Sequence, residues 1–310
     1  MDITGGNEDA PARPADEPLM AERRNLANIA YRLLGSLTEA EDAVQEAYTR
    51  WFAQPVERRA AVANPAAWLT TVVSRICMDQ LRSARMRRER YVGEWIPEPL
   101  PARAEWSELS HGSTARDPAD DITLDESVEM AFLVVLDSMT PAERVAFMLH
   151  DVFRVPFNEI AEIVGRTPGA CRELASSGRR RVAAARTRGA RARRRSALVG
   201  EFRQAWQAKD VDALVRLLDP SVVAIADGGG RAMASPVPVQ GHLRVAELLV
   251  HLAGLAGRLD LLERTVNGQP GLVAVNGSEV LTVYAFDIDE SRIRRIWAIR
   301  NPDKLQSWGS

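Results

Sequence analysis

The sequence predicts a multidomain protein in which two all-helical domains precede an α+β domain. Three observations support this order. Apolar residues recur at helical spacing from about residue 21 to 90 and again from about 124 to 188. Between these stretches lies an acidic segment with several prolines and no periodicity, which predicts a linker. After about residue 220, short apolar runs separated by turn signals such as Asn267-Gly268 predict strands.

Length and charge agree with this division. The 310 residues are enough for two or three domains, and 46% hydrophobic with 26% charged residues is typical of a globular protein. The formal net charge of −2 conceals a segregation, because arginines are dense in residues 75–90 and 166–195 whereas residues 98–137 are mostly acidic. Such segregation indicates basic nucleic-acid-binding surfaces separated by an acidic linker.

The sequence also indicates a compartment. The first 20 residues lack the basic start and apolar stretch of a signal peptide, and no apolar run reaches the roughly 20 residues needed to cross a bilayer. We therefore expect a cytoplasmic protein without a membrane partner. Cys77 and Cys171 each lie in an apolar helical pattern without Cys or His at metal-ligand spacing. We expect both to be core residues, and we expect no metal and no cofactor.

In the first helical stretch, Thr38 and Glu41 predict a capping box at the start of a helix. One face of this helix is apolar, with Ala40, Ala43, Val44, Ala47 and Trp51. The opposite face is polar, with Glu39, Asp42, Gln45, Glu46 and Arg50. Asn64-Pro65 predicts the start of the next helix, which has a strongly basic end. Its buried stripe consists of Leu69, Val72, Val73, Ile76 and Leu81.

The second helical stretch predicts a helix–turn–helix. Thr140-Pro141 with Glu143 predicts a capping box, residues 157–164 a short helix, Gly165 the turn and Pro168 the start of another helix. In that last helix the residues expected to point inward are Cys171, Leu174, Ala175, Gly178 and Val182. The residues expected to point outward, toward a DNA major groove, are Arg172, Glu173, Ser176, Ser177, Arg179 and Arg180. Gly178 weakens the helix by about 1 kcal/mol relative to Ala.

The last third predicts an α+β domain with helices on one face of a curved antiparallel sheet. The predicted helices cover residues 197–209, 211–218 and 243–254. The predicted strands cover residues 222–226, 237–240, 260–266, 271–275, 280–286 and 293–300.

The basic end of the first helical stretch has two interpretations. Trp68 either stacks on an unpaired base or packs in the core. The arginines at 75, 82, 85 and 88 either track a single-stranded backbone or are solvated.

These motifs resemble a known family. Residues 42–48 (DAVQEAY), followed by Trp51, resemble the polymerase-binding part of sigma region 2. Trp68-Leu69 and residues 79–85 look like its −10 element reader, and the helix–turn–helix resembles region 4, which reads the −35 element. Over about residues 23–188 the chain resembles an extracytoplasmic-function (ECF) sigma factor of the sigma-70 family. The resemblance implies RNA polymerase core enzyme and promoter DNA as partners, and a protein that is not an enzyme.

Further motifs resemble one ECF subgroup that carries a fused C-terminal SnoaL-like domain of the NTF2-like fold. They are residues 91–100 (YVGEWIPEPL), 227–230 (DGGG) and 301–305 (NPDKL). Two positions depart from the expected pattern, with Ile96 in place of Leu and Gly178 in place of Ala. The resemblance implies two all-α sigma domains, the region 2 bundle and the region 4 helix–turn–helix, followed by an α+β NTF2-like cone. The expected division is a disordered tail (1–19), region 2 (20–90), a linker (91–122), region 4 (123–190) and the SnoaL-like domain (196–310).

The resemblance also implies residue roles. The coiled coil of the polymerase largest subunit is expected to contact Asp42, Gln45, Glu46 and Arg50. The −10 strand is expected to contact Trp68, Arg75, Asp79, Arg82, Ser83 and Arg85. The −35 element is expected to contact Arg172, Glu173, Ser176, Ser177, Arg179 and Arg180. The interdomain contacts that regulate the protein in cis are expected at Trp95, Pro97, Asp227, Gly228, Gly229, Asn301, Pro302 and Asp303.

Alternatives remain open for the C-terminal domain. Its polar residues expected near a pocket are Asp227, Arg231, His242 and Asp287. Such a group could perform acid–base chemistry, help to bind a small-molecule ligand, or serve only as an intramolecular surface, and Asp227 before three glycines also predicts a simple turn. Two other functions of the whole chain remain open. It could be a ligand-responsive DNA-binding regulator, or an NTF2-like enzyme fused to a DNA-binding module.

Overall fold

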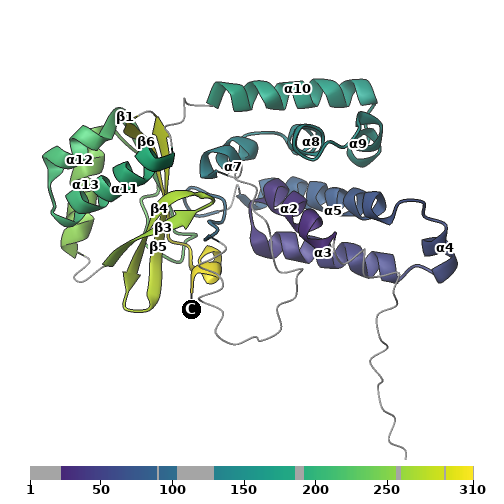
Figure 1. Ribbon diagram of the computed structural model, residues 1–310, viewed down its shortest axis with the longest axis horizontal. Helices are drawn as coiled ribbons and strands as arrows, with labels where there is room; N and C mark the ends of the chain where they lie inside the picture. The colour runs from purple at the N-terminus through teal and green to yellow at the C-terminus, as the bar shows by residue number, and fades with distance from the viewer. Residues whose placement is uncertain are drawn as a thin grey trace, which may run out of the picture.

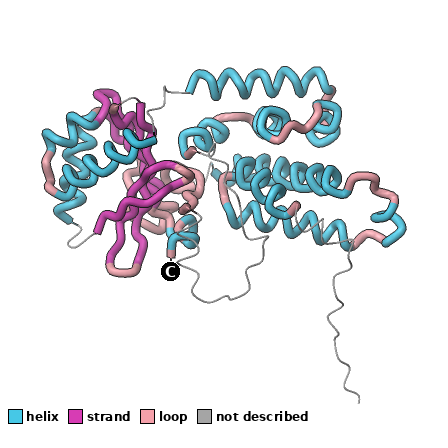
Figure 2. Tube along the Cα trace, in the orientation of Figure 1, coloured by secondary structure: helices cyan, strands magenta, loops and turns pink. Residues whose placement is uncertain are grey.

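The computed structural model describes residues 22–88, 91–102, 129–185, 192–255, 260–289 and 291–309, with the side chains of 84–88, 192 and 255 excepted. The predicted N-terminal tail, most of the predicted linker and the side chain of Arg85 therefore lie outside the described residues. Two helical domains lie on one side of the molecule, and the sheet with its own helices lies on the other (Figure 1). Figure 2 shows the same separation of helices from strands.

The first helical domain follows the predicted pattern. Its helices are α2 (Arg23–Leu34), α3 (Leu37–Phe52), α4 (Val56–Ala60) and α5 (Pro65–Arg88). The apolar face of α3 is buried as predicted, and the Asn64 side chain accepts a hydrogen bond from the backbone N–H of Ala67 at the start of α5. Cys77 is buried in this core as a free thiol, as expected.

The predicted capping box at Thr38 and Glu41 is wrong. The N-cap of α3 is Ser36, whose side chain accepts a hydrogen bond from the backbone N–H of Glu39. Ser36 Oγ and the backbone N–H of Leu37 both donate to Glu98 Oε2, at 3.2 and 2.8 Å. The carboxylate that caps this helix therefore comes from a segment about 60 residues away, which local spacing cannot reveal.

The second helical domain confirms the predicted helix–turn–helix. Its elements are α7 (Met130–Asp137), α8 (Pro141–Phe147), the π-helical turn η2 (Met148–Val152), α9 (Phe157–Val164) and α10 (Pro168–Ala185). The capping box of Thr140 and Glu143 is present, and Gly165 ends α9 in the left-handed conformation. Cys171, Ala175 and Gly178 are buried on the inner face of α10.

The structure gives a reason for glycine at position 178. A Cβ atom placed there would lie 2.7 Å from Cβ of Phe147 in α8, so α10 approaches α8 more closely than alanine would allow. We therefore expect Gly178→Ala to lower the midpoint of thermal unfolding. Overpacking typically costs about 1–3 kcal/mol, which exceeds the roughly 1 kcal/mol that alanine gains in helix propensity.

The control for this prediction is Gly200→Ala in α11. There the nearest atom to an added Cβ is the Glu263 carboxylate at 3.4 Å, so alanine fits and should raise the unfolding midpoint. If both substitutions stabilise the protein, close packing does not explain Gly178.

The two helical domains share one hydrophobic core. Its buried residues come from α2, α3 and α5 as well as from α7 to α10, and α5 packs against both α8 and α9. The buried side chain of Arg144 crosses this boundary, with Nη2 donating to the carbonyl of Arg32 at 3.0 Å. Its Nη1 contacts Oδ1 of Asp137 at 3.3 Å, and burial lowers the pKa of Arg144 to about 9.

The C-terminal domain confirms the predicted mixture of helices and strands. Its helices are α11 (Ala192–Gln207), α12 (Val211–Leu217) and α13 (His242–Leu255), with short 3-10 turns η3 (Pro302–Lys304) and η4 (Gln306–Trp308) near the end. Its strands are β1 (Leu218–Asp227), β2 (Val239–Gln240), β3 (Asp260–Val266), β4 (Gln269–Asn276), β5 (Glu279–Asp289) and β6 (Arg292–Ile299). In the part of the chain that the structure describes, no helix is long and apolar enough to cross a membrane.

The sheet is not fully antiparallel, contrary to prediction. The strand order is β2-β1-β6-β5-β4-β3, and β1 pairs with β6 in parallel although the other neighbours are antiparallel. The chain leaves β1 and returns only after β2 to β5. The last strand of the meander, β6, then lies beside β1 and runs in the same direction. Helices α11–α13 cover one face of the sheet. The other face packs against Met130 and Val134 of α7 and against Ile96.

Candidate functional site

The linker segment (residues 91–102) is the structural centre of the molecule. Residues 96–101 are buried, although their prolines and acids predicted a simple linker. One side of this segment contacts the first helical domain and the other contacts the C-terminal domain. It therefore acts as a shared structural element rather than as a loose tether.

Asp227, at the end of β1, holds the linker segment from the C-terminal side. Its side chain is fully buried, and Oδ2 accepts hydrogen bonds from the backbone N–H of Ile96 at 2.9 Å and from Lys304 Nζ at 2.6 Å. Oδ1 accepts from the Tyr91 hydroxyl at 2.6 Å. The Lys304 ammonium also donates to the carbonyl of Ile96 and lies 4.2 Å from the centre of the Trp95 ring. A buried ion pair with its remaining hydrogen bonds satisfied thus joins the two segments.

The two motifs of the C-terminal domain meet at this point. Asn301 Nδ2 donates to the Tyr91 hydroxyl at 2.9 Å, and a Cβ atom on Gly229 would lie 2.3 Å from that Asn301 nitrogen. Gly229 also has a φ of 58°, so both space and backbone conformation favour glycine. Asp303 pairs with Arg231 on the exposed rim of this contact. Burial and the neighbouring Asp227 carboxylate raise the pKa of Tyr91, which keeps its hydroxyl a donor.

Several of the residues that hold the linker segment were missed by sequence analysis. The Tyr31 hydroxyl of α2 donates to the carbonyl of Glu98 at 2.8 Å and accepts from Asn267 Nδ2 at 2.9 Å. Asn267 also exchanges backbone and side-chain hydrogen bonds with Leu100. Trp308 Nε1 donates to the carbonyl of Pro99 at 2.8 Å. In the sequence, Asn267-Gly268 predicted only a turn between two strands. The hydrogen bonds of Asn267 to Tyr31 and Leu100 were not predicted.

Glu98 connects the linker segment to the first helical domain. Its backbone N–H donates to the carbonyl of Gly35 at 2.8 Å, and its carboxylate caps α3 as described above. Burial raises the pKa of Glu98, although the hydrogen bonds from Leu37 and Ser36 oppose this shift. The linker segment therefore caps the start of α3 through Glu98 and is bonded to the end of β1 through Asp227.

The predicted polymerase-binding residues share the exposed face of α3. Asp42, Gln45, Glu46 and Arg50 are all exposed, and Arg50 pairs with Glu46 at 2.8 Å. These four side chains form one exposed polar face on α3.

The described −10 residues on α5 already have contacts within the chain. Trp68 is half-buried and packs against Trp51 with ring centres 5.1 Å apart, as its core interpretation requires. Arg75 Nη2 donates to the carbonyl of Glu162 in α9 at 3.0 Å. Arg82 pairs with Asp79 at 3.2 Å, and the Ser83 hydroxyl donates to the carbonyl of Gln80. Part of the predicted −10 surface is therefore in contact with the second helical domain.

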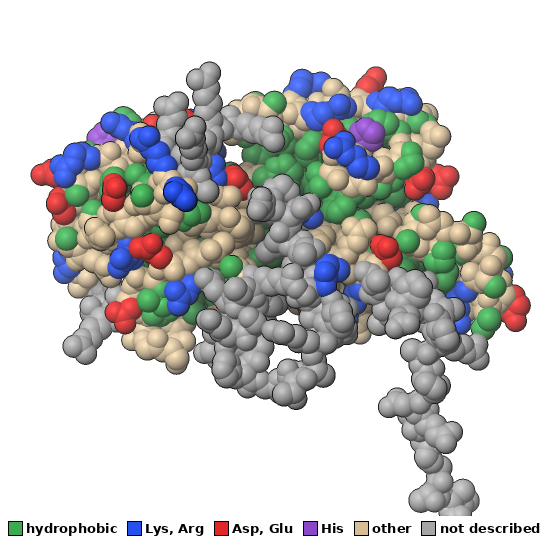
Figure 3. All heavy atoms as spheres, viewed as in Figure 1, with side chains coloured by type: hydrophobic (Ala, Val, Ile, Leu, Met, Phe, Trp, Pro, Cys, Tyr) green, Lys and Arg blue, Asp and Glu red, His purple; other side chains and the backbone are tan. Residues whose placement is uncertain are grey.

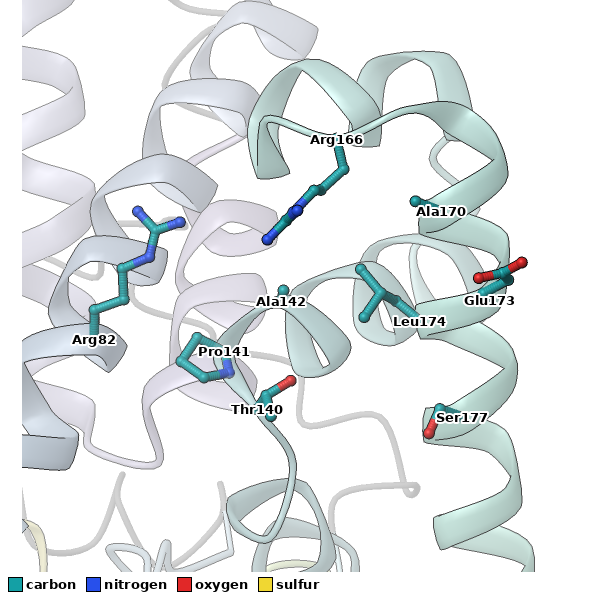
Figure 4. A pocket seen from close by; sticks show the side chains of 9 residues that line it. All are labelled: Arg82, Thr140, Pro141, Ala142, Arg166, Ala170, Glu173, Leu174 and Ser177. Atoms are coloured by element: carbon teal, nitrogen blue, oxygen red, sulfur yellow. The ribbon is translucent and has the colours of Figure 1, made fainter.

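A cavity of about 570 Å³ lies between Arg82 of α5 and the second helical domain. Arg82 and Arg166 point into it from opposite sides, whereas Glu173 points away (Figure 4). Its complete lining is Arg82, Thr140, Pro141, Ala142, Arg166, Ala170, Glu173, Leu174 and Ser177. Residues predicted to read two different promoter elements thus lie around one cavity.

The predicted −35 residues lie on α10 with one correction. Arg172, Glu173, Arg179 and Arg180 are exposed, as predicted. The predicted outward orientation of Ser177 is wrong, because its half-buried hydroxyl donates to Glu143 Oε1 of α8 at 2.8 Å. Helical spacing within α10 could not predict this contact, because Glu143 belongs to the capping box of another helix, α8.

Besides Ser177, four of the six residues that were predicted to face outward on α10 have contacts within the chain. Arg179 lies 3.6 Å from Asp151, and Arg180 donates to the half-buried Ser176 hydroxyl at 3.2 Å. Arg172 lies over the Phe157 ring at 5.4 Å. All three arginines have long, exposed side chains and can exchange these contacts for DNA.

Comparisons with known proteins decide the family. A sigma-70 region 2 model matches residues 19–87, and a sigma-70 region 4 model matches residues 129–182. ECF RNA polymerase sigma factor SigJ of Mycobacterium tuberculosis is 38% identical over 299 residues, covering 92% of this chain and 91% of SigJ. The chain belongs to the ECF RNA polymerase sigma factors. The probable ECF sigma factor SigI of the same species is 31% identical, covering 94% of this chain and 95% of SigI.

The fold of this ECF sigma factor agrees with a solved relative. The crystal structure of Mycobacterium tuberculosis SigJ matches with a TM-score of 0.72 at 34% identity, covering 94% of this chain and 98% of that chain. This confirms the predicted fold class of two helical sigma domains followed by an α+β NTF2-like domain.

The enzyme alternative finds no support in the arrangement of the C-terminal polar residues. Asp227 is occupied by the linker segment, Arg231 pairs with Asp303, and Asp287 pairs with Arg295 at 3.4 Å. His242 lies at the start of α13. Within the described ranges, no three His, Cys, Asp or Glu residues are grouped as metal ligands. The relatives SigJ and SigI are sigma factors.

Proposed function

We propose that this ECF sigma factor is regulated in cis, with the C-terminal domain holding the two helical domains in a closed arrangement. As a member of its family, the chain directs RNA polymerase core enzyme to promoter DNA and supports initiation. The observation that carries the proposal is the linker segment, which is bound on one side by Asp227 and Lys304 and on the other by Tyr31 and the start of α3.

The closed arrangement conflicts with promoter reading. The hydrogen bond that the exposed Arg75 guanidinium donates to the carbonyl of Glu162 competes with a contact between Arg75 and the −10 strand. We infer that α5 must separate from α9 before Arg75, Arg82 and Arg85 reach the unpaired strand, and that the outward face of α10 reads the −35 element. The exposed face of α3 would bind the coiled coil of the polymerase largest subunit in either arrangement.

The C-terminal domain is suited to control this separation because it binds all three neighbours. It contacts the linker segment through Asp227, the first helical domain through Asn267, and the second through the buried Met130 of α7. As a tethered domain it acts at high effective concentration, so no separate inhibitor is required. The proposal needs no small-molecule ligand. We propose the same domain bounds that the sequence predicts: region 2 at residues 20–90, the linker at 91–122, region 4 at 123–190 and the C-terminal domain at 196–310.

Run-off transcription with core polymerase tests the proposal. Full-length protein should support initiation that core polymerase alone does not, and charge reversal at Arg82 and Arg85 should weaken open-complex formation. The matched control reverses Arg216 and Arg244, two exposed arginines of the C-terminal domain. If the Arg82/Arg85 variant transcribes as well as the control, α5 does not hold the −10 strand.

A further inference from the structure

The start of α11 carries two arginines that the proposed function does not use. Arg193 and Arg194 are exposed, and neither makes an ion pair or hydrogen bond with the described part of the chain. Other arginines of the same domain are paired, such as Arg203 with Glu263 at 2.8 Å and Arg295 with Asp287 at 3.4 Å. Arg193 and Arg194 place two exposed positive charges, without acidic partners in the described part of the chain, side by side at the start of α11.

Helix stability does not account for this pair. The first turn of α11 contains no acidic residue. Positive side chains near the amino end of a helix oppose its dipole and slightly destabilise it. The two arginines therefore do not serve to stabilise the helix that carries them.

The next residue places this pair beside the second helical domain. Arg195 is largely buried, and its Nη1 donates to Glu129 Oε1 at 3.0 Å and to Gln269 Oε1 at 2.6 Å. Glu129 is the N-cap residue of α7, and α7 packs against α10. The start of α11 is therefore attached to the domain that carries the −35 helix.

The chain path also keeps the pair near α10. That helix ends at Ala185 and α11 begins at Ala192, so the connection spans at most about 25 Å. Arg180 and Arg181 are exposed on the last part of α10. Lys and Arg side chains gather over the second helical domain and again on the upper part of the C-terminal domain in Figure 3. Basic side chains are thus exposed both on α10 and on the C-terminal domain.

We propose that Arg193 and Arg194 bind the phosphate backbone of duplex DNA that flanks the −35 element. This inference rests on the proposed function, because it requires α10 to dock on promoter DNA. Guanidinium groups bind phosphates without regard to base sequence, so these residues add affinity and not specificity. The C-terminal domain would then take part in promoter binding as well as in its control.

The salt dependence of holoenzyme binding to promoter DNA tests the inference. Each phosphate contact contributes about 0.9 to the slope of log affinity against log salt. Arg193→Gln/Arg194→Gln should therefore reduce the slope by about 1.8, so that wild-type affinity falls roughly tenfold more than the variant's between 50 and 200 mM salt. The matched control is Arg216→Gln/Arg244→Gln, which removes the same charge elsewhere on the C-terminal domain and should keep the wild-type slope.

Two duplex lengths make the test specific. A duplex with ten extra base pairs on each side of the −35 element should bind the wild type more tightly than one that ends at the element. The Arg193/Arg194 variant should lose this advantage, and scrambling the flanking sequence should not. If the variant and the wild type show equal slopes of log affinity against log salt, and the holoenzyme still selects its promoter, this inference is wrong and the proposed function stands. A holoenzyme that binds promoter DNA no better than core polymerase would overturn the proposed function and this inference with it.

Discussion

Replacement of Lys304 by methionine is expected to release the linker segment from the C-terminal domain and to raise run-off transcription by the full-length protein. The substitution leaves the fully buried Asp227 carboxylate without its cation. Removing one partner of a buried ion pair typically costs about 3–5 kcal/mol. The protein can relieve most of this cost by letting the linker segment detach, since water then reaches Asp227.

Two measurements check this result. The midpoint of thermal unfolding should fall, and transcription per mole of holoenzyme should rise, because the two helical domains are no longer held together. The control is Arg231→Gln, which removes the cation of the exposed pair with Asp303. Exposed pairs contribute about 0–1 kcal/mol, so this variant should behave almost as the wild type.

A double-mutant cycle separates charge from packing. Asp227→Asn alone leaves Lys304 buried without a carboxylate, whereas Asp227→Asn/Lys304→Met leaves no buried charge at this contact. The double variant should therefore be destabilised by clearly less than the sum of the two single variants. If Lys304→Met unfolds and transcribes like the wild type, the Asp227–Lys304 pair does not hold the closed arrangement.

Local patterns predicted the elements of the fold well. The apolar spacing of α3, the Thr140–Glu143 capping box and the bounds of α9 all follow from neighbours within one or two helical turns. Predictions failed where a partner lies far away in the chain. Ser36 caps α3 together with Glu98, and β1 pairs with β6 across most of the domain. No local pattern contains such information.

The candidate site shows the same division. Resemblance to a family drew attention to Asp227, Trp95 and Asn301. The structure places Asp227 and Asn301 against the linker segment, to which Trp95 belongs. It did not indicate Tyr31 or Asn267, because a buried tyrosine and an Asn-Gly turn each have a sufficient local explanation. Contacts between domains depend on how complete domains dock, so they become visible only when all three domains are placed.

Met130→Asp is expected to separate the C-terminal domain from the second helical domain and to activate transcription through a different contact. Met130 is 3% exposed and belongs to the core between α7 and the C-terminal sheet. A carboxylate there would be buried without a partner, which is strongly unfavourable. At the first position of a helix, however, aspartate agrees with the helix dipole, so α7 itself should persist.

A substitution three residues away provides the decisive comparison. Leu133 is fully buried, but it belongs to the core that the two helical domains share. Leu133→Asp should therefore unfold the second helical domain and abolish run-off transcription, whereas Met130→Asp should raise it. The exposed Val92 supplies a neutral control, since Val92→Asp adds the same charge in solvent. If Met130→Asp abolishes transcription as Leu133→Asp does, the C-terminal domain is a structural support for the second helical domain and not its inhibitor.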